Sequence, residues 1–404
     1  MKNQLRLLSW ALYDFANTIF SAVVLTFYFP LYLTSLTRRN LNLGVTTSLA
    51  MISAGLVVPW LGALSDRTGK TKTYLILTTV LSCLFTVLLS LFNFVPFLMA
   101  DFLLACFFFH ASLVFYFSLL PIVAEPERQG FASGLGTGLG YLGVLFALPI
   151  AHAVDLHFGR RFVFIVAGVL FLVFSLPLFF WVPERKVENP AAPSLKFLFK
   201  EWSGVFKTLG RMRKNPPVFF FFLGNFCVME AMNTVIFWMV VYLARVFGLP
   251  QSFLIMVFLG LNFGAFLFGF VAGFLTDRWG AEKTLLAAIS AFFLTLLGLG
   301  LTENYWIFIG LSVTGGAFGL AGNWTAARKR VIELVPEKEV GQYFGLYNLV
   351  TKISVTSSLV FSILADRFGF RAALLSQLIP NGAGLVFLWL ARTSRRNASP
   401  HPSS

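Results

Sequence analysis

The 404-residue chain contains few charged side chains, since Asp, Glu, Lys and Arg make up only 12% of it. Soluble domains carry about 25% charged residues, so this composition is not that of a water-soluble protein. Cysteine is scarce too. Cys83, Cys106 and Cys227 all lie in apolar segments, at spacings that match neither a zinc site nor a redox pair. We therefore expect no metal site and no cofactor.

The sequence also lacks the motifs of common enzymes. It contains no Gly-x-Ser-x-Gly, no His-Glu-x-x-His and no phosphate-binding loop with its lysine. We expect the protein not to be an enzyme. Because the sequence shows no ATP-binding domain, we expect any work it performs to draw on a gradient.

Apolar sequence is what the chain has in abundance, with 57% hydrophobic residues. About 20 consecutive apolar residues are enough to cross a bilayer. The first apolar run is too long for a secretion signal and lacks a small-residue cleavage site, so we interpret it as a membrane helix. We predict an all-α integral membrane protein with twelve spans, near residues 7–36, 44–64, 73–93, 95–124, 130–153, 162–183, 216–244, 251–276, 283–302, 304–327, 341–365 and 370–391.

The basic residues predict the orientation of these spans. Lys and Arg number 31 against 17 Asp and Glu, but they lie in short loops between apolar runs, so we exclude nucleic acid as a partner. With both termini cytoplasmic, the cytoplasmic segments carry 23 Lys and Arg residues and the opposite side carries 7. Positive charge is enriched on the cytoplasmic side of membrane proteins. The short loops without outward sequons fit a bacterial inner (plasma) membrane.

The one long connection divides the spans six and six. We predict an N-terminal six-helix bundle at 1–186, a cytoplasmic linker at 187–215, a C-terminal six-helix bundle at 216–393 and a disordered polar tail at 394–404. Apolar residues recur at helical spacing in the linker among basic ones, which predicts an amphipathic helix in the membrane interface. A role in regulation or partner binding is the alternative.

An internal repeat relates the two halves. The segment 62–69, with sequence GALSDRTG, returns at 273–280 as GFLTDRWG, displaced by 211 residues. The same displacement carries Asp155 onto Asp366, Gly130 onto Gly341 and Gly134-Leu135 onto Gly345-Leu346. Such a match predicts two bundles related by pseudo-two-fold symmetry.

The first span of each half carries an acid three residues before Asn-Thr. Asp14 precedes Asn17, and Glu230 precedes Asn233. A charged side chain near the centre of a membrane helix costs roughly 2.5–3.5 kcal/mol, so such residues usually face a cavity or a partner. We predict that both acids and both amides, with Tyr13, bind substrate or protons. The alternative is that each acid is structural and hydrogen-bonded to a neighbouring helix.

Span eleven carries a basic residue near its middle, Lys352, with Asn348 one turn before it. Lys352 is predicted to bind a substrate carboxylate or to act as counter-ion to one of the acids. Snorkelling of its side chain to the cytoplasmic surface is the alternative.

The repeated GxL[S/T]DRxG segments resemble the cytoplasmic signature of the major facilitator superfamily. The opening WALYDFAN, the FGLY of span eleven and the GYLG of span five resemble its vacuole-effluxer-like, autophagy-related branch. Two departures from that branch are Glu230-Ala231 in place of Asp-Gly and a span-ten pattern that keeps only its glycine and Arg328. The resemblance implies the major facilitator fold and a cytoplasmic conformational latch, formed by Gly62, Asp66, Arg67, Gly69, Gly273, Asp277, Arg278, Gly280 and Arg328.

We therefore expect a secondary transporter that works by alternating access. The resemblance implies a small organic solute, with amino acids as the first candidates, moved as efflux and with proton coupling left open. We expect a monomer whose partners are this solute and the lipid bilayer. The alternatives are a membrane sensor or scaffold that acts through the 187–215 helix, and a lipid translocator on the same fold.

Overall fold

The computed structural model describes residues 2–37, 39–91, 93–125, 129–184, 203, 207–335, 340–354 and 357–398. Over these residues the chain forms helices and no strand, and eleven helices are long and apolar enough to cross a membrane. Large apolar side chains point outward, among them Phe180 at 75% and Phe270 at 67% exposed. Soluble monomers rarely expose so much apolar surface. The predicted all-α integral membrane fold is confirmed.

The chain forms two compact units, each described here by itself. The first contains Met1–Glu201 together with Leu243–Arg245 and Leu249–Ile255. Its helices are α1 (Lys2–Ile19), η1 (Phe20–Tyr28), α2 (Phe29–Thr37), α3 (Asn40–Thr68), α4 (Thr71–Leu88), α5 (Val95–Ser118), α6 (Leu120–Val123), α7 (Gln129–Phe158) and α8 (Arg160–Trp181).

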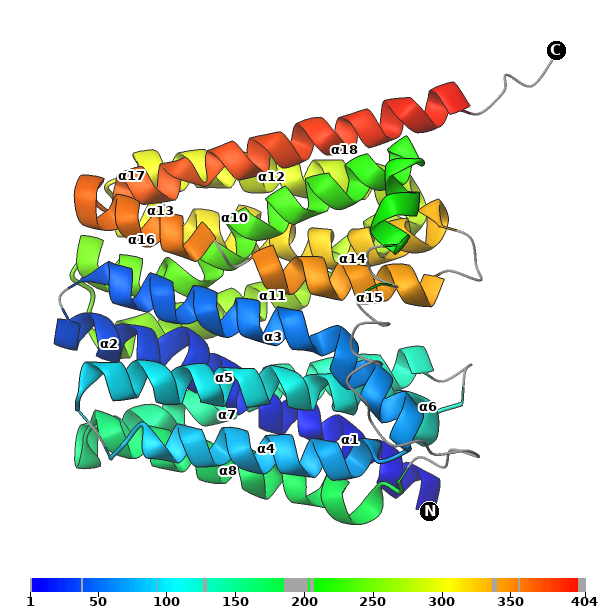
Figure 1. The fold of residues 1–404 in the computed structure, drawn as a ribbon. Coiled ribbons are helices and arrows are strands. Elements are labelled where there is room, and N and C mark those ends of the chain that lie inside the picture. Colours follow the sequence, from blue (N-terminus) through cyan, green and yellow to red (C-terminus); the bar gives the residue numbers. More distant parts are fainter. Residues whose placement is uncertain are drawn as a thin grey trace. The chain divides into compact units, whose positions relative to one another are not determined.

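The first predicted span is a continuous path of α1, η1 and α2. Its middle part, η1, has the wide turns of a π-helix, and there the Thr26 hydroxyl donates to the Ser21 carbonyl five residues back. Such π segments often occur at functional sites. In the same unit α1 packs on α7 and α8, while α4 lies between α5 and α8 (Figure 1).

The second unit contains Trp202–Tyr242, Val246–Gly248 and Met256–Ser404. The helices lying wholly or mostly in it are α10 (Pro216–Val246), α11 (Gln251–Trp279), α12 (Ala281–Leu301), α13 (Tyr305–Leu311), η3 (Ser312–Gly316), α14 (Ala317–Leu334), α15 (Val340–Ile353), α16 (Ser357–Phe368), α17 (Phe370–Ser376) and α18 (Leu378–Ala398). The predicted span 341–365 corresponds to α15 and α16. Each of these is too short to cross a bilayer alone, so this span is absent from the eleven.

The repeated motif ends at a glycine in both units because the chain turns sharply there. Gly69 follows α3 with a φ of 69°, and its N–H donates to the carbonyl of Ser65. Gly280 has a φ of 86° and stands directly before α12. Residues with a Cβ rarely adopt positive φ, so glycine is the residue that fits this tight connection.

Two predicted segments lie partly outside the described residues. In the linker only residue 203 and residues 207–215 are described, and 207–213 are helical. The predicted amphipathic helix therefore remains a prediction. At the other end, α18 continues to Ala398, five residues into the segment predicted as a polar tail from Ser394.

Candidate functional site

Asp14 lies on α1 with both carboxylate oxygens hydrogen-bonded. The Asn17 amide, one turn later, donates to Asp14 Oδ1 at 2.9 Å. The Tyr116 hydroxyl, from α5, donates to Asp14 Oδ2 at 2.9 Å. Hydrogen bonds to a carboxylate are stronger than those between neutral groups, so Asp14 holds α1 against α5 inside the first unit.

An aromatic stack positions Tyr116. The ring of Tyr116 lies 4.5 Å from that of Trp10 and 4.9 Å from that of Tyr13, and both pairs are stacked. The Trp10 indole donates to the Tyr116 carbonyl at 3.1 Å. The Tyr13 hydroxyl is 2.7 Å from that of Thr79 on α4. All three rings are fully buried, so Tyr13 lies within the scaffold of the site.

Glycines of α7 leave the space that Asp14 occupies. A Cβ built on Gly136 would collide with Asp14 Oδ2. Further along, a Cβ on Gly140 would lie 3.0 Å from the Thr18 hydroxyl, and one on Gly143 would lie 2.7 Å from the Phe15 carbonyl. Small residues at this spacing let two membrane helices approach closely.

Glu230 holds the start of α16 in the second unit. Its Oε2 accepts the N–H of Ser357, the first residue of α16, at 2.7 Å. The Ser357 hydroxyl in turn donates to the Glu230 carbonyl at 2.9 Å and is hydrogen-bonded to Thr234. The first N–H groups of a helix have no partner inside it, and the positive end of the dipole lies there. A carboxylate at this place therefore stabilises the start of α16.

Asn233 binds the end of α15 and the residue that follows it. Its amide donates to the Thr351 carbonyl at 3.1 Å and to the Ser354 hydroxyl at 2.9 Å. Asn233 and Glu230 lie one turn apart on α10 and so contact the end of α15 and the start of α16. The side chains of the other two predicted residues of this half, Asn348 and Lys352, lie outside the described residues.

The residues predicted to form the latch are described only in part. Gly69 and Gly280 form the sharp turns noted above. Asp277 accepts from Lys329 of α14 at 2.8 Å, with side chains 81% and 43% exposed. Arg278 lies 6.0 Å from the ring centre of Phe274. Arg328 is exposed. A Cβ built on Gly273 would meet no other atom within 4 Å. The surroundings of Gly62 and the side chains of Asp66 and Arg67 are not among the described parts of the structure.

Sequence reasoning missed an acid that caps a helix at an end of the first unit. Glu184, just after α8, accepts the N–H of Lys72 at 2.6 Å and the N–H and hydroxyl of Thr73 at 3.1 and 2.9 Å. These N–H groups belong to the first turn of α4. The available signal was an acid directly after a predicted span.

A second missed feature is a charge cluster in the second unit. Arg330, with a side chain only 4% exposed, pairs with Glu282 and with Glu333, the latter at 3.1 Å. Arg392 of α18 pairs with Glu282 at 3.0 Å. The cluster thus joins α12, α14 and α18. Of its pairs, Arg330–Glu333 is three positions apart on one helix, whereas the two pairs made by Glu282 join different helices and have no local spacing.

Buried amides in the second unit were also missed. Asn225 and Asn381 are 1% and 0% exposed, and neither amide atom has a hydrogen-bond partner among the described residues. The amide of Asn323 donates to the Met229 sulfur at 3.2 Å, while its oxygen has no such partner. Within the described part of the chain, no group of three His, Cys, Asp or Glu residues is placed to hold a metal ion.

Comparison with known proteins places this geometry in context. The profile of a family described as vacuole effluxer Atg22 like matches residues 42–399. The chain is 29% identical to an uncharacterized protein of Aquifex aeolicus over 395 residues, 96% of this chain and 97% of the relative. It is 24% identical over 411 residues to the uncharacterized MFS-type transporter YxiO of Bacillus subtilis, 94% of this chain and 93% of that protein. Among solved structures, the nucleoside transporter NupG has a TM-score of 0.76 at 14% identity, over 96% of this chain and 99% of that one.

Proposed function

Because the chain belongs to the vacuole effluxer Atg22-like family of the major facilitator superfamily, we propose that it exports a small organic solute in exchange for protons. Amino acids are the first class of solute to test. The family description supports the direction, since it names an effluxer. Transport proceeds by alternating access, and both termini lie on the cytoplasmic side, as the distribution of Lys and Arg indicates.

The observation that carries this proposal is the hydrogen-bonded carboxylate of Asp14 inside a membrane helix. Its partners are an amide and a phenol, and no ion pair joins Asp14 to a base in the described part of the chain. A permanently charged structural acid is usually paired with a base at such depth. Partners that are neutral and able to reorient suit an acid that gains and loses a proton.

Protonation of Asp14 can reverse the direction of its hydrogen bond with Tyr116. The ionised Asp14 only accepts, and Tyr116 and Asn17 both donate to it. The protonated acid has a hydrogen of its own to donate, and the Tyr116 hydroxyl can rotate to accept it. Protonation therefore changes the contact between α1 and α5 without breaking the stack that positions Tyr116.

Glu230 extends the same proposal to the second half. Its carboxylate bonds to the N-terminus of α16, where negative charge is favoured. Neutralising it weakens that bond and loosens the start of α16. We propose that the two acids act as one proton-responsive element in each half. Lys352 and Asn348 remain candidates for contact with the solute.

The latch is proposed at the predicted cytoplasmic ends of the helices. The pair Asp277–Lys329 is solvent-exposed, and such pairs contribute little to stability. A contact of this kind can break and reform at small cost while the protein changes conformation.

The test is solute exit from proteoliposomes under an imposed pH gradient. Liposomes containing the protein are loaded with a radiolabelled amino acid mixture, and the outside is made acidic. Proton-coupled exchange predicts faster exit than at equal pH. Asp14→Asn and Glu230→Gln should remove this acceleration. The matched control is Asp101→Asn, which neutralises another buried carboxylate of the first unit. Exit that ignores the gradient and survives both variants would overturn proton coupling.

A further inference from the structure

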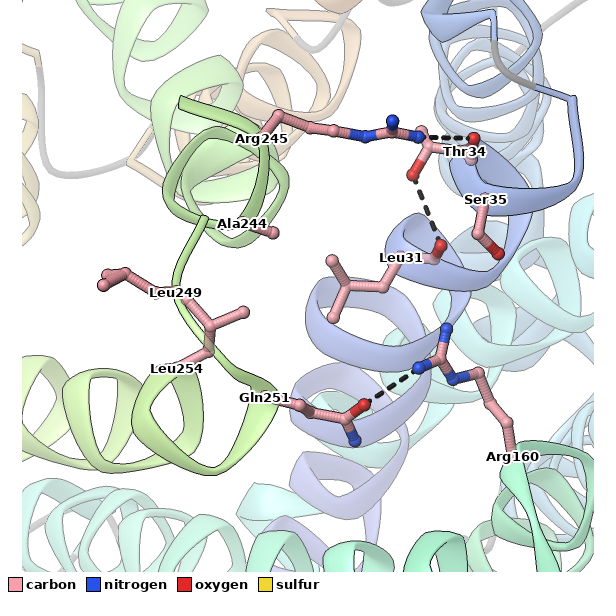
Figure 2. A pocket seen from close by; sticks show the side chains of 9 residues that line it. All are labelled: Leu31, Thr34, Ser35, Arg160, Ala244, Arg245, Leu249, Gln251 and Leu254. Carbon is pink, nitrogen blue, oxygen red and sulfur yellow. Dashed lines mark hydrogen bonds between the residues drawn. The ribbon is translucent and has the colours of Figure 1, made fainter. Parts of the chain in front are cut away.

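The short connection between α10 and α11 is flanked by Leu243–Arg245 and Leu249–Ile255, which belong to the first unit and lie against the ends of α2 and α8 there (Figure 2). Arg245 donates to the Thr34 carbonyl at 2.8 Å. The Gln251 amide donates to Asp155 Oδ2 at 2.5 Å and to the Tyr28 hydroxyl at 3.1 Å. Arg160 donates to Gln251 Oε1 at 2.9 Å. These bonds hold the connection at the end of the unit that is predicted to face outward.

A pocket of about 440 Å³ opens beside this connection. Its volume falls in the range of about 300–1,000 Å³ that is typical of small-molecule sites. Two arginines, Arg160 and Arg245, line it, and none of its nine lining residues is acidic. Figure 2 shows both guanidinium groups reaching toward the space between α2 and the connection. The pocket shares no residue with the clusters around Asp14 and Glu230.

The charge of the pocket is only partly balanced. Arg160 lies 3.9 Å from Asp155, which offsets some of its charge. Arg245 has the Thr34 carbonyl as its partner, and no ion pair joins it to a carboxylate in the described part of the chain. A guanidinium group has five donors in a planar fork. One bond to a carbonyl therefore leaves most of the Arg245 donors available to a ligand.

The remaining wall is apolar. Leu31 of α2 contributes to it, together with Leu249 and Leu254 of the connection and of the start of α11. A pocket with guanidinium groups on one side and leucines on the other matches an anion with an aliphatic body.

We propose that this pocket binds the carboxylate of a small aliphatic organic anion. Arg245 holds the carboxylate through its two parallel N–H groups, which match carboxylate geometry, and Arg160 adds a second positive charge. The leucines cover the aliphatic part. This site goes beyond the proposed export reaction, because it lies apart from the acids that are to carry protons. It recognises its ligand by the negative charge of a carboxylate.

The test measures binding of 3-methylbutanoate to the purified protein in detergent by isothermal titration calorimetry. Its neutral isostere, 3-methylbutanamide, is the matched ligand. Saturable binding of the acid and at least about tenfold weaker binding of the amide are expected, because a hydrogen bond to a charged group contributes about 1.5–3 kcal/mol. Equal binding of the two ligands, or no binding of either, would overturn the proposal.

Three variants test whether the ligand binds in this pocket. Arg245→Gln should weaken binding about tenfold or more. Arg161→Gln removes an exposed arginine that does not line the pocket and should leave affinity unchanged. Ala244→Phe fills the pocket without changing its charge and should abolish binding, which keeps the test decisive if Arg245→Gln does not fold. Unchanged affinity in whichever of Arg245→Gln and Ala244→Phe folds would overturn the site.

Two further measurements distinguish this pocket from the proton-carrying acids and from a lipid site. Asp14→Asn should bind the acid normally, so loss of proton coupling and loss of this site are distinguishable. Titration in nanodiscs compares neutral phosphatidylcholine with phosphatidylglycerol. Affinity that is equal in the two supports a soluble anion as ligand. Binding that the anionic lipid abolishes would assign the pocket to a lipid headgroup and overturn the proposal.

Discussion

The hydroxyl of Tyr116 donates to the carboxylate of Asp14 over 2.9 Å, although 102 positions separate the two residues in the chain. The bond crosses from α5 to α1 and ends at a membrane-embedded acid. It connects the element expected to respond to protons with a rigid aromatic stack. Its removal is therefore the most direct test of how the first unit uses that acid.

Tyr116→Phe should keep the stack and remove only the hydroxyl. The free energy of unfolding should fall by about 1.5–3 kcal/mol, because a donor to a charged group is lost. Acceleration of solute exit by an acidic exterior should also weaken. Thermal unfolding measures the change in stability, and solute flux from proteoliposomes measures the acceleration. Tyr74→Phe is the control, since the ring of Tyr74 lies against Phe115 and its hydroxyl forms no bond among the described residues. Equal behaviour of the two variants would contradict the role of the Tyr116 hydroxyl.

The glycines of α7 provide a matched pair of substitutions. Gly136→Ala should destabilise the protein by about 1–3 kcal/mol, because the new methyl group meets the Asp14 carboxylate. Gly138→Ala meets nothing within 4 Å and should instead stabilise the helix by about 0.5–1 kcal/mol. Thermal unfolding of both variants checks the signs. A double variant, Gly136→Ala with Asp14→Ala, should recover part of the loss. Identical shifts for the two glycines would show that the close approach is wrong.

Glu230 is expected to hold the first turn of α16 in place. Glu230→Leu removes the acceptor, whereas Glu230→Gln keeps an uncharged one. Amide hydrogen exchange of Ser357 and its neighbours should rise strongly in the first variant and moderately in the second. Hydrogen–deuterium exchange with mass spectrometry measures this. Exchange at Thr276, in α11 of the same unit, serves as the internal reference. Exchange near Ser357 that matches the unsubstituted protein in both variants would refute the capping role.

The ion pairs of the second unit differ in burial and should differ in effect. Glu282→Gln leaves the buried Arg330 with Glu333 as its one carboxylate partner among the described residues and should cost about 1–3 kcal/mol of stability. The Glu303 side chain, the partner of Arg371, is 82% exposed, so Glu303→Gln should cost far less stability. Thermal unfolding of the two variants gives the comparison. A similar loss in both would mean that burial does not decide the strength of these pairs.

The exposed pair should also show a pH dependence of definite sign. The hydrogen bond and the charge of Arg371 lower the pKa of Glu303. The contribution of the pair is therefore present above the ordinary pKa of glutamate and is lost as the pH falls through the lowered value. The small stability difference between the unsubstituted protein and Glu303→Gln should vanish in acid. A difference that grows on acidification would contradict this assignment.

The sequence predicted features that depend on local pattern. Hydropathy placed the spans, and the repeat at an offset of 211 predicted that Gly69 and Gly280 share a role, which the positive φ of both explains. The contact of Glu230 with the start of α16 was not predicted. Nothing within 341–365 indicates this contact, because the carboxylate comes from Glu230, more than a hundred positions away.

Partners from distant helices were beyond sequence reasoning for the same reason. Asp14 was identified by its cost in a membrane, but its bond to Tyr116 depends on how α5 packs. In each unit, a charged side chain from the end of the last helix or just after it binds the start of another helix, α4 in the first unit and α12 in the second. In the first unit an acid after α8, Glu184, binds the start of α4; in the second a base of α18, Arg392, binds Glu282 at the start of α12. At the offset of 211 residues Arg392 aligns with Trp181 and Glu282 with Thr71, so a repeat search does not relate these two contacts.

The missing side chain at position 136 also limits how this sequence can evolve. Any larger residue there competes for the volume that the Asp14 carboxylate fills. A substitution at either position changes what is tolerated at the other, so the two sites should vary together among descendants of this chain. A lineage that loses the acid becomes free to replace the glycine, whereas the reverse order passes through a strained intermediate.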